Sequence, residues 1–298
     1  MSRVEQALRR AGQATTLAPV HPRQDVLAAG ADTLSLDFYP GEQRAPVAAV
    51  PVAAVPAVST TDSFLATADF IDGDFSPRFS DAYKDKVVTS ATLPSSTVEQ
   101  YRRLAASLHH LQTEQGLRSL TITSSVPQEG KTLTSVNLAM TLSESYKRRV
   151  LLVDADLRRP SLHQVFGFPA GLGLCEALRS AAGEIVPLVH VSPRLSVLPA
   201  GLPDGDPMTA LASPRIAELL EEAASDFDWV LLDAPPVALM ADAGLLVRLT
   251  RAVILVIGAG STPYTVVEKV VAEVGRENIV GTVLNRTEDA PGTLATYY

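Results

Sequence analysis

Short runs that are almost entirely apolar, separated by segments with helical periodicity, constrain the fold of this chain more than any other feature. Six such runs are found, at residues 120–124, 150–153, 195–198, 229–232, 253–257 and 280–284. Strands without polar alternation are typical of a parallel sheet that helices cover on both faces. We therefore expect an α/β fold with a doubly wound, mostly parallel sheet. Ligands of such sheets bind at the carboxyl ends of the strands.

A loop containing glycine and lysine follows the first apolar run. Residues 125–132 read SVPQEGKT and precede a predicted helix. Gly130, Lys131 and Thr132 match the end of the phosphate-binding pattern GxxxxGK followed by Ser or Thr, although Ser125 replaces its first glycine. Backbone N–H groups at the start of such a helix bind phosphate, the lysine adds positive charge, and the threonine hydroxyl is a ligand for Mg²⁺. The residues predicted to bind the nucleotide here are Gln128, Glu129, Gly130, Lys131, Thr132 and Leu133.

Aspartates follow two of the other runs. Asp154 and Asp156 come after residues 150–153, and Asp233 comes after residues 229–232. The carboxyl ends of parallel strands share one edge of the sheet, so these carboxylates should lie beside the phosphate-binding loop. One of them can help to bind Mg²⁺ while another accepts a proton from an attacking hydroxyl group. A nucleotide site explains the three aspartates better than separate turns or helix caps do.

The first 92 residues differ in composition from the rest. Pro46, Pro51 and Pro56 interrupt an apolar stretch at intervals of five residues. Proline blocks helix continuation, so this stretch suits an extended linker and does not suit a transmembrane helix. The apolar spacing of residues 4–11 predicts a short helix ahead of the linker.

Three parts are therefore expected along the chain. They are a short helix with a largely disordered Pro/Ala-rich linker at residues 1–92, a P-loop domain at 93–286, and a mobile tail at 287–298. The first helix of the domain should begin with a capping box of Ser96 and Glu99 and end at Gly116.

Composition excludes several classes of protein. The net charge of -8 at pH 7 argues against nucleic acid as the main partner. A single cysteine excludes an internal disulfide. The sequence contains no uninterrupted stretch of about 18 apolar residues, so no transmembrane helix is predicted. The first residues lack the apolar core of a signal peptide. We expect a cytoplasmic protein.

Three motifs together resemble those of the bacterial tyrosine kinases, the BY-kinases of capsule and exopolysaccharide export. They are VPQEGKT at residues 126–132, LLVDADLRRP at 151–160 and LLDAPP at 231–236. The likeness covers roughly residues 93–290 and extends to LSVLPAG, LASPRIAELL and GTVLNR. DADLR is its most specific element, because ordinary P-loop ATPases lack it.

The resemblance implies a P-loop fold of the deviant-Walker type and an ATP-dependent protein-tyrosine kinase. It implies that Asp154 accepts the proton of the tyrosine and that Asn285 contacts the base of the nucleotide. The implied catalytic residues are Lys131, Asp154 and Asp156, and the implied ligands of Mg²⁺ are Thr132, Asp156 and Asp233.

The resemblance also implies phosphoacceptors and partners. Family members end in tyrosines that neighbouring subunits phosphorylate, which makes Tyr297 and Tyr298 the expected acceptors. The implied activator is a separate membrane-embedded protein of the chain-length-regulator type, which would bring the chain to the inner face of the membrane. Self-association through the helix at 96–114 and the tail, and a cognate tyrosine phosphatase, are implied as well.

The chain departs from the family pattern at three places. Gln128 replaces the usual glycine and the tail has only two tyrosines, and these two departures leave an alternative open. The oligomer motif ExxRxxR reads Glu99, Arg102 and Ala105, which argues against a ring-shaped oligomer without excluding it. The alternative is a nucleotide-binding regulatory or positioning ATPase of the export machinery, similar to Min and Par proteins, without kinase activity. Val126 stands where Min and Par proteins carry a signature lysine, which argues against a positioning ATPase of their type and leaves the regulatory ATPase open.

Overall fold

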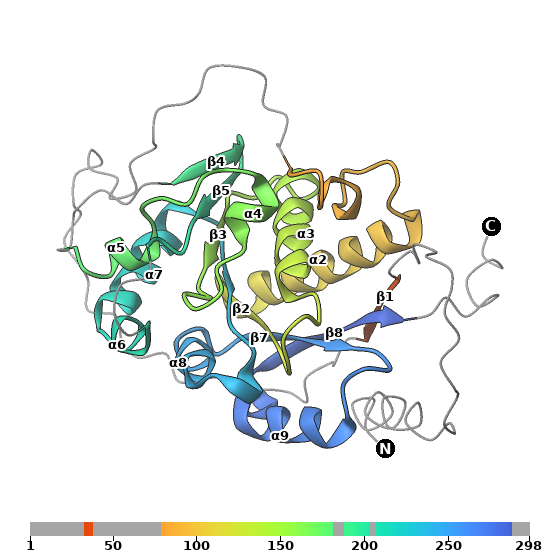
Figure 1. Cartoon of the computed structure of the whole chain (residues 1–298). Helices are drawn as coiled ribbons and strands as arrows, with labels where there is room; N and C mark the ends of the chain where they lie inside the picture. The colour runs from red at the N-terminus through yellow and green to blue at the C-terminus, as the bar shows by residue number, and fades with distance from the viewer. Residues whose placement is uncertain (1–32, 38–78, 181–187, 203–206, 288–298) are drawn as a thin grey trace.

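The computed structural model describes residues 33–37, 79–180, 188–202 and 207–287. Within them one sheet has eight strands in the order β1-β8-β7-β2-β6-β3-β5-β4 (Figure 1). The six inner strands are parallel, and β1 and β4 pair antiparallel to them at the two edges. The strands are β1 (Thr33–Asp37), β2 (Ser119–Ser124), β3 (Val150–Asp154), β4 (Val189–Ser192), β5 (Leu195–Leu198), β6 (Trp229–Asp233), β7 (Val253–Gly258) and β8 (Ile279–Thr287).

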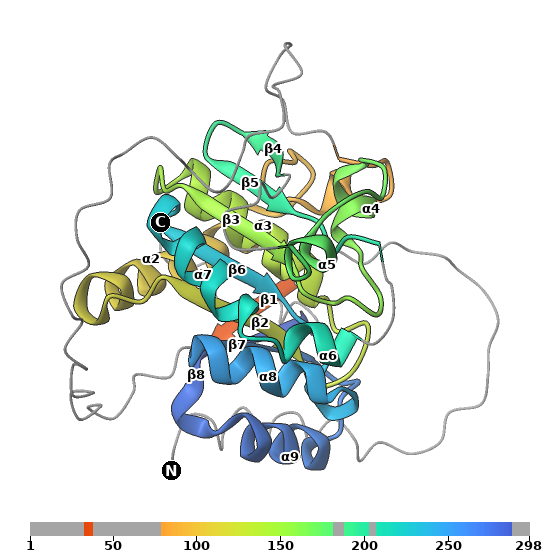
Figure 2. The ribbon, with the colours of Figure 1, turned by 90° about the vertical axis from the view of Figure 1, so that its left-hand side faces the viewer.

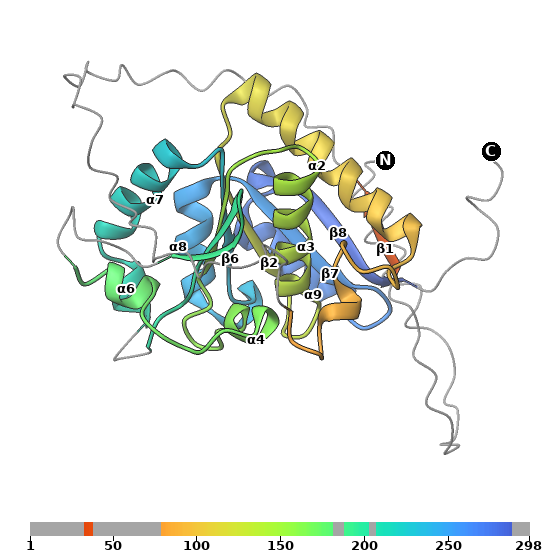
Figure 3. The same ribbon diagram turned by 90° about the horizontal axis from the view of Figure 1, so that it is seen from above.

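Helices cover both faces of the sheet. One layer contains α2 (Ser95–Gln115), α3 (Lys131–Glu144) and α4 (Leu162–Phe166), and the other contains α5 (Leu174–Ala177), α6 (Pro207–Leu211), α7 (Arg215–Asp226), α8 (Ala241–Thr250) and α9 (Tyr264–Val274). Figure 3 shows α2 and α3 on one side of the strands and α7 and α8 on the other, and α7 lies over β6 (Figure 2). Three 3-10 turns complete the described elements: η1 (Lys84–Lys86), η2 (Val237–Leu239) and η3 (Arg276–Asn278).

The apolar runs explain this layering. Each of the six predicted runs forms one inner strand, and the predicted fold class is confirmed. Successive side chains of a strand face opposite sides. In β3, Leu152 therefore packs in the core beneath α2 and α3, and Leu151 packs in the core beneath α7. Both side chains are fully buried, as a parallel inner strand requires.

Helix α2 begins differently from the prediction. Pro94 occupies the N-cap position without a side-chain hydrogen bond, so the predicted capping box of Ser96 and Glu99 is wrong. The helix starts at Ser95, which places Ser96 inside its first turn, and the Glu99 carboxylate instead lies 3.8 Å from Arg102 Nη1. The predicted end is confirmed, because Gly116 adopts the left-handed conformation there with φ 67°.

Part of the predicted linker belongs to the folded unit. Strand β1 pairs with β8, and residues 79–92 pack against α3 and α4. The Phe79 ring lies 5.4 Å from that of Phe166, and Val87 is buried. The predicted boundary at 93 therefore falls inside packed structure. The predicted helix near the amino terminus and the proline-rich stretch at 45–58 lie outside the described residues. Nothing in the part of the chain that the structure describes forms an apolar helix of membrane-spanning length.

Asn137 joins residues 79–92 to α3. Its side chain is buried, Oδ1 accepts a hydrogen bond from Val88 N at 2.8 Å, and Nδ2 donates to Lys86 O at 3.0 Å. One amide thus satisfies a donor and an acceptor of a segment without regular structure.

We expect Asn137→Ala to lower the free energy of unfolding by about 2 kcal/mol, because two backbone groups lose their partners. Urea denaturation measures this loss, and hydrogen exchange at Val88 should accelerate. Ser145→Ala, at an exposed position just after the same helix, is the control and should change neither quantity. An Asn137→Ala protein with the stability of the control would contradict the assigned role.

Candidate functional site

The predicted phosphate loop connects β2 to α3 and holds two residues in the left-handed conformation. Gln128 has φ 67° and Gly130 has φ 92°. A Cβ atom on Gly130 would displace the Asn285 amide, and any side chain would be strained at this φ, so glycine is strongly favoured at that position. Glycine adopts positive φ at the lowest cost, which explains a glycine preference at position 128 as well. Gln128 tolerates the same backbone conformation at some cost in strain.

The loop presents a row of backbone donors. Among the described residues, none accepts a hydrogen bond from the N–H groups of residues 128–133. These groups lie at the amino terminus of α3, where the helix dipole also favours negative charge. The arrangement fits a polyphosphate, and Leu133 contributes to it through its backbone.

Lys131 lies between two of the predicted carboxylates. Its Nζ is 2.9 Å from Asp156 Oδ2 and 3.7 Å from Asp233 Oδ1, and its side chain is only 11% exposed. Burial opposes the charge of the ammonium group, but Asp233 and Asp156 outweigh burial and raise the pKa of Lys131. The group is therefore held protonated at the edge of the loop.

Hydroxyl groups hold Asp233 in place. Thr132 Oγ1 donates to Asp233 Oδ2 at 2.7 Å, and Ser135 Oγ donates to Oδ1 at 3.1 Å. Thr132 Oγ1 also lies 3.0 Å from Ser161 Oγ. The sequence analysis missed Ser135 and Ser161. Ser135 follows Lys131 by four residues on the same face of α3, a spacing that could have indicated it.

Asp154 is the register neighbour of Asp233 across β3 and β6. Its Oδ2 accepts hydrogen bonds from the N–H groups of Ser161 and Leu162 at 2.9 and 3.0 Å. Its Oδ1 is buried and has no partner among the described residues. Burial, and then the nearby Asp233 carboxylate, raise the pKa of Asp154 to about 7.

The charges of this site fit a divalent cation bound with a nucleotide. Asp154, Asp156 and Asp233 face the single ammonium group of Lys131, and burial raises the pKa of Asp233 as well. No three His, Cys, Asp or Glu side chains of the described residues form a metal site on their own. Mg²⁺ keeps several ligands from water and substrate phosphates, so the Thr132 hydroxyl with one or two carboxylates suffices.

Two further predicted residues of the site stabilise the loop, Glu129 from within it and Asn285 from β8. The buried Glu129 side chain bonds to Val126, Gly258 and Thr262. Asn285 Nδ2 donates to Glu129 O at 2.9 Å. Tyr297 and Tyr298 lie outside the described residues.

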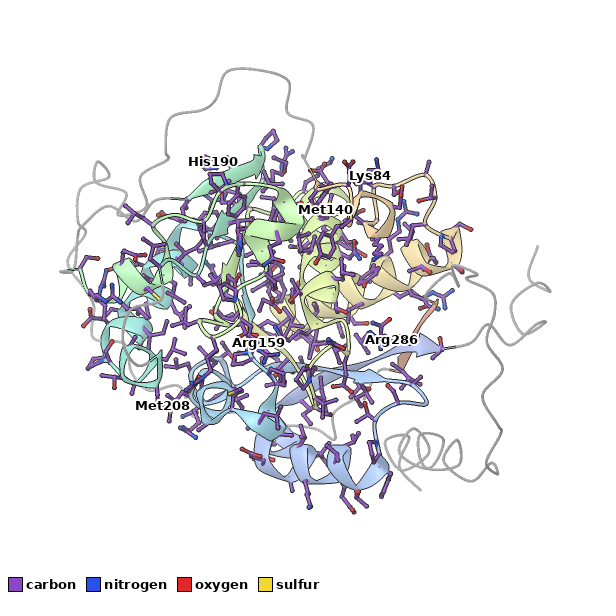
Figure 4. The ribbon with its side chains drawn as sticks, in the orientation of Figure 1. Lys84, Met140, Arg159, His190, Met208 and Arg286 are labelled. Carbon is purple, nitrogen blue, oxygen red and sulfur yellow. The ribbon has the colours of Figure 1, made fainter. Side chains whose placement is uncertain are left out.

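Arg286 adds a contact that the sequence analysis missed. This residue, labelled in Figure 4 at the end of β8, donates from Nη2 to Gln128 O at 2.6 Å. The last strand therefore touches the phosphate loop through two consecutive side chains, those of Asn285 and Arg286.

A cavity of about 240 Å³ lies elsewhere in the molecule. Its lining residues are Gln112, Thr113, Gly116, Arg118, Arg148 and Asp228. Arg118, Arg148 and Asp228 lie one or two residues before β2, β3 and β6, so the cavity is at the amino-terminal edge of the sheet, opposite the carboxylates. It is separate from the candidate site.

The raised pKa of Asp154 predicts a pH-dependent stability. Between its ordinary pKa of 3.8 and about 7 the folded state keeps a proton that the unfolded chain has released, so stability falls as pH rises through this range. Asp154→Asn does not titrate. Its free energy of unfolding relative to the wild type should therefore increase by up to about 4 kcal/mol between about pH 4 and about pH 7. Urea denaturation across that range measures the change. Asp85→Asn, at an exposed position, is the control. If the difference in free energy of unfolding between Asp154→Asn and the wild type did not change with pH, the raised pKa of Asp154 would be contradicted.

The chain was compared with family models, with curated proteins and with solved structures. No family model matches it. The tyrosine-protein kinase YwqD of Bacillus subtilis is 34% identical over 177 residues, which cover 59% of this chain and 74% of YwqD. CapB of Staphylococcus aureus is 28% identical over 212 residues, which cover 69% of this chain and 91% of CapB.

Solved structures agree with these relatives. The kinase domain of the Escherichia coli tyrosine kinase ETK matches with a TM-score of 0.61 at 30% identity, over 68% of this chain and 80% of that domain. The chimerical protein CapA2B2 matches with a TM-score of 0.60 at 25% identity, over 71% of this chain and 92% of the chimera. Sequence identity, coverage and fold thus agree with the motifs around the phosphate loop, and the chain belongs to the bacterial tyrosine kinase family.

Proposed function

We propose that this chain is an ATP-dependent protein-tyrosine autokinase that regulates the polymerisation and export of exopolysaccharide or capsule, and that it phosphorylates Tyr297 and Tyr298 in trans. The observation that carries the proposal is the grouping of Lys131 with loop N–H groups and a buried Asp154 Oδ1 that have no hydrogen-bond partner within the described part of the chain. Donors for phosphate and an acceptor for a proton thus lie at one edge of the sheet.

Lys131 and the loop N–H groups bind and orient the β- and γ-phosphates of ATP. Thr132, Asp156 and Asp233 would hold Mg²⁺, which supplies charge neutralisation for the phosphate oxygens. Preorganised donors of this kind stabilise the charge that develops during phosphoryl transfer.

Asp154 is the general base. The tyrosine hydroxyl gives its proton to Asp154 Oδ1, the phenolic oxygen bonds to the γ-phosphorus, and the bond to the bridging oxygen of ADP breaks. A carboxyl group whose pKa is raised to about 7 suits this role, because a base works best when its pKa lies near the operating pH. Hydrogen bonds from the N–H groups of Ser161 and Leu162 fix its other oxygen and so orient Oδ1.

The acceptor tyrosines belong to the last residues of the chain. Twelve residues follow Arg286, and fully extended they reach roughly 40 Å. That reach is sufficient to enter the site of a neighbouring subunit. Phosphorylation would add a charge of about -1.5 to -2 to each tyrosine, and the carboxylates of the site would then repel the product.

The proposed partners follow from the family. The activator is a separate membrane-embedded protein of the chain-length-regulator type, which holds this chain at the inner face of the membrane, and a cognate tyrosine phosphatase reverses the reaction. Self-association uses α2 together with the tail. In α2, Glu99, Arg102 and Arg103 are exposed, which supports such a surface, whereas Ala105 is buried and adds nothing to it.

Two substitutions separate binding from transfer. Lys131→Met should abolish both ATP binding and phosphorylation, because the ammonium group that faces the loop is lost. Asp154→Asn should keep ATP binding but lower the rate of transfer by roughly 10²–10⁴. Titration calorimetry and incorporation of labelled phosphate measure the two effects, and Lys269→Met, at an exposed position on α9, is the control. Unchanged ATP affinity in Lys131→Met would remove the assignment of the loop.

A mixing experiment tests the trans mechanism. A Lys131→Met protein with intact tyrosines should become labelled when it is incubated with an active protein that carries Tyr297→Phe and Tyr298→Phe. Mass spectrometry locates the label. Labelling of the wild type alone, with none on the inactive partner, would contradict transfer in trans. ATP binding without label on either tyrosine in any mixture would favour the regulatory or positioning ATPase instead.

A further inference from the structure

We propose that Glu129 and Thr262 are positioning residues that hold the phosphate loop in the shape required for binding ATP. The inference rests on the proposed function, in which this loop binds the β- and γ-phosphates. Neither side chain needs to touch the nucleotide. Both act through the backbone of the loop.

The Glu129 side chain is a buried link between three segments of the chain. It is 2% exposed, and its Oε2 accepts a hydrogen bond from Val126 N at 2.7 Å. Its Oε1 accepts one from Gly258 N at 2.8 Å and another from the hydroxyl of Thr262. The carboxyl group therefore connects the end of β2 to the end of β7 and to the start of α9.

The hydrogen-bond pattern requires an acceptor at both oxygens. All three partners are donors, two of them backbone N–H groups and one a hydroxyl. No Lys, Arg or His in the described part of the chain forms an ion pair with Glu129. Donors of this kind are the partners that make burial of a carboxyl group tolerable.

Strand β8 holds the other side of the same residues. Asn285 Nδ2 donates to Glu129 O, and Arg286 Nη2 donates to Gln128 O. In a trans peptide the carbonyl of one residue points opposite to the N–H of the next. A fixed Glu129 carbonyl therefore directs the N–H of Gly130 away from Asn285. The Gln128 carbonyl directs the N–H of Glu129 in the same manner.

These contacts together set the direction of the loop donors. Glu129 is fixed through its side chain by β7 and α9, and through its carbonyl by β8. A preorganised set of N–H groups binds an anion more tightly than a loop that must be ordered during binding. Thr262 is the partner whose contribution can be removed without changing the loop sequence.

Thr262→Val tests the proposal, because it replaces the hydroxyl with a methyl group of similar size. In the full chain we expect about tenfold weaker binding of ATP by titration calorimetry. We also expect faster hydrogen exchange at residues 126–130 in the absence of nucleotide. Thr262→Ser keeps the hydroxyl and should restore both quantities. Thr265→Val, at an exposed position in the first turn of α9, is the matched control and should leave both unchanged.

Glu129→Gln is a second, independent test. The amide oxygen can replace Oε1 toward Gly258 and Thr262, but the amide NH₂ group then faces the N–H of Val126, which is also a donor. Faster exchange in the loop and weaker ATP binding are expected again, with the melting temperature recorded for each variant.

Two results would overturn the positioning role. One is wild-type ATP affinity and wild-type loop exchange in Thr262→Val. The other is an equal loss in Thr262→Ser, since the hydroxyl is then not responsible. Failure of the proposed function gives a different result, namely no ATP binding by the wild type, or ATP binding without phosphorylation of Tyr297 and Tyr298. Hydrogen exchange still tests the positioning of the loop in that case, because this measurement needs no nucleotide.

Discussion

Three buried carboxyl groups share one ammonium group at the carboxyl ends of the inner strands, and the rest of the structure serves to maintain this arrangement. Asp154 and Asp233 are in register on adjacent parallel strands, so the sheet itself brings two acids together. Lys131 reaches Asp156 and Asp233 from the first turn of α3. Without the sheet to hold them together, the carboxylates would repel one another, move apart and be hydrated individually.

Burying like charges side by side destabilises the folded protein. The hydrophobic cores on both faces of the sheet offset this destabilisation. β3 and β6 are buried over their whole length, which leaves their register no freedom to shift. Hydrogen-bond donors then fix the carboxylate oxygens. The hydroxyl groups of Thr132 and Ser135 donate to Asp233. Rigidly held carboxylates in excess over the nearby ammonium group are suited to bind a divalent cation, and the loop N–H groups are suited to bind the phosphate.

Local sequence signals predicted the inner strands, the loop and the aspartates, because each depends on residues that are neighbours in the chain. The six apolar runs and the segment SVPQEGKT are of this kind. The meeting of the aspartates with the loop followed from the parallel sheet, but the individual hydrogen bonds between other distant residues were not predicted. Ser161 lies 29 residues from Thr132, and Thr262 lies 133 residues from Glu129. Nothing in the local pattern of these two residues distinguishes them from ordinary polar residues in a loop or near a helix start.

The difference between local signals and distant contacts also explains why the order of residues 79–92 was not predicted. Residues 79–92 have no strong periodicity, and they are ordered through distant partners such as Asn137. The predicted capping box was wrong although its local sequence pattern of Ser96 and Glu99 was present. The N-cap of the helix is Pro94, two residues before Ser96, and Glu99 pairs along the helix with Arg102.

Strand β1 has a consequence for the behaviour of shortened forms of the chain. It pairs antiparallel with β8 and so occupies one edge of the sheet. Removal of residues 33–37 would open the edge of β8 over residues 282–287, the part of this strand that β1 pairs with. Open edges of this length are templates for association with another strand. A short segment far from the kinase motifs thus protects the molecule against edge-to-edge aggregation, and a domain boundary chosen from motifs alone would discard it.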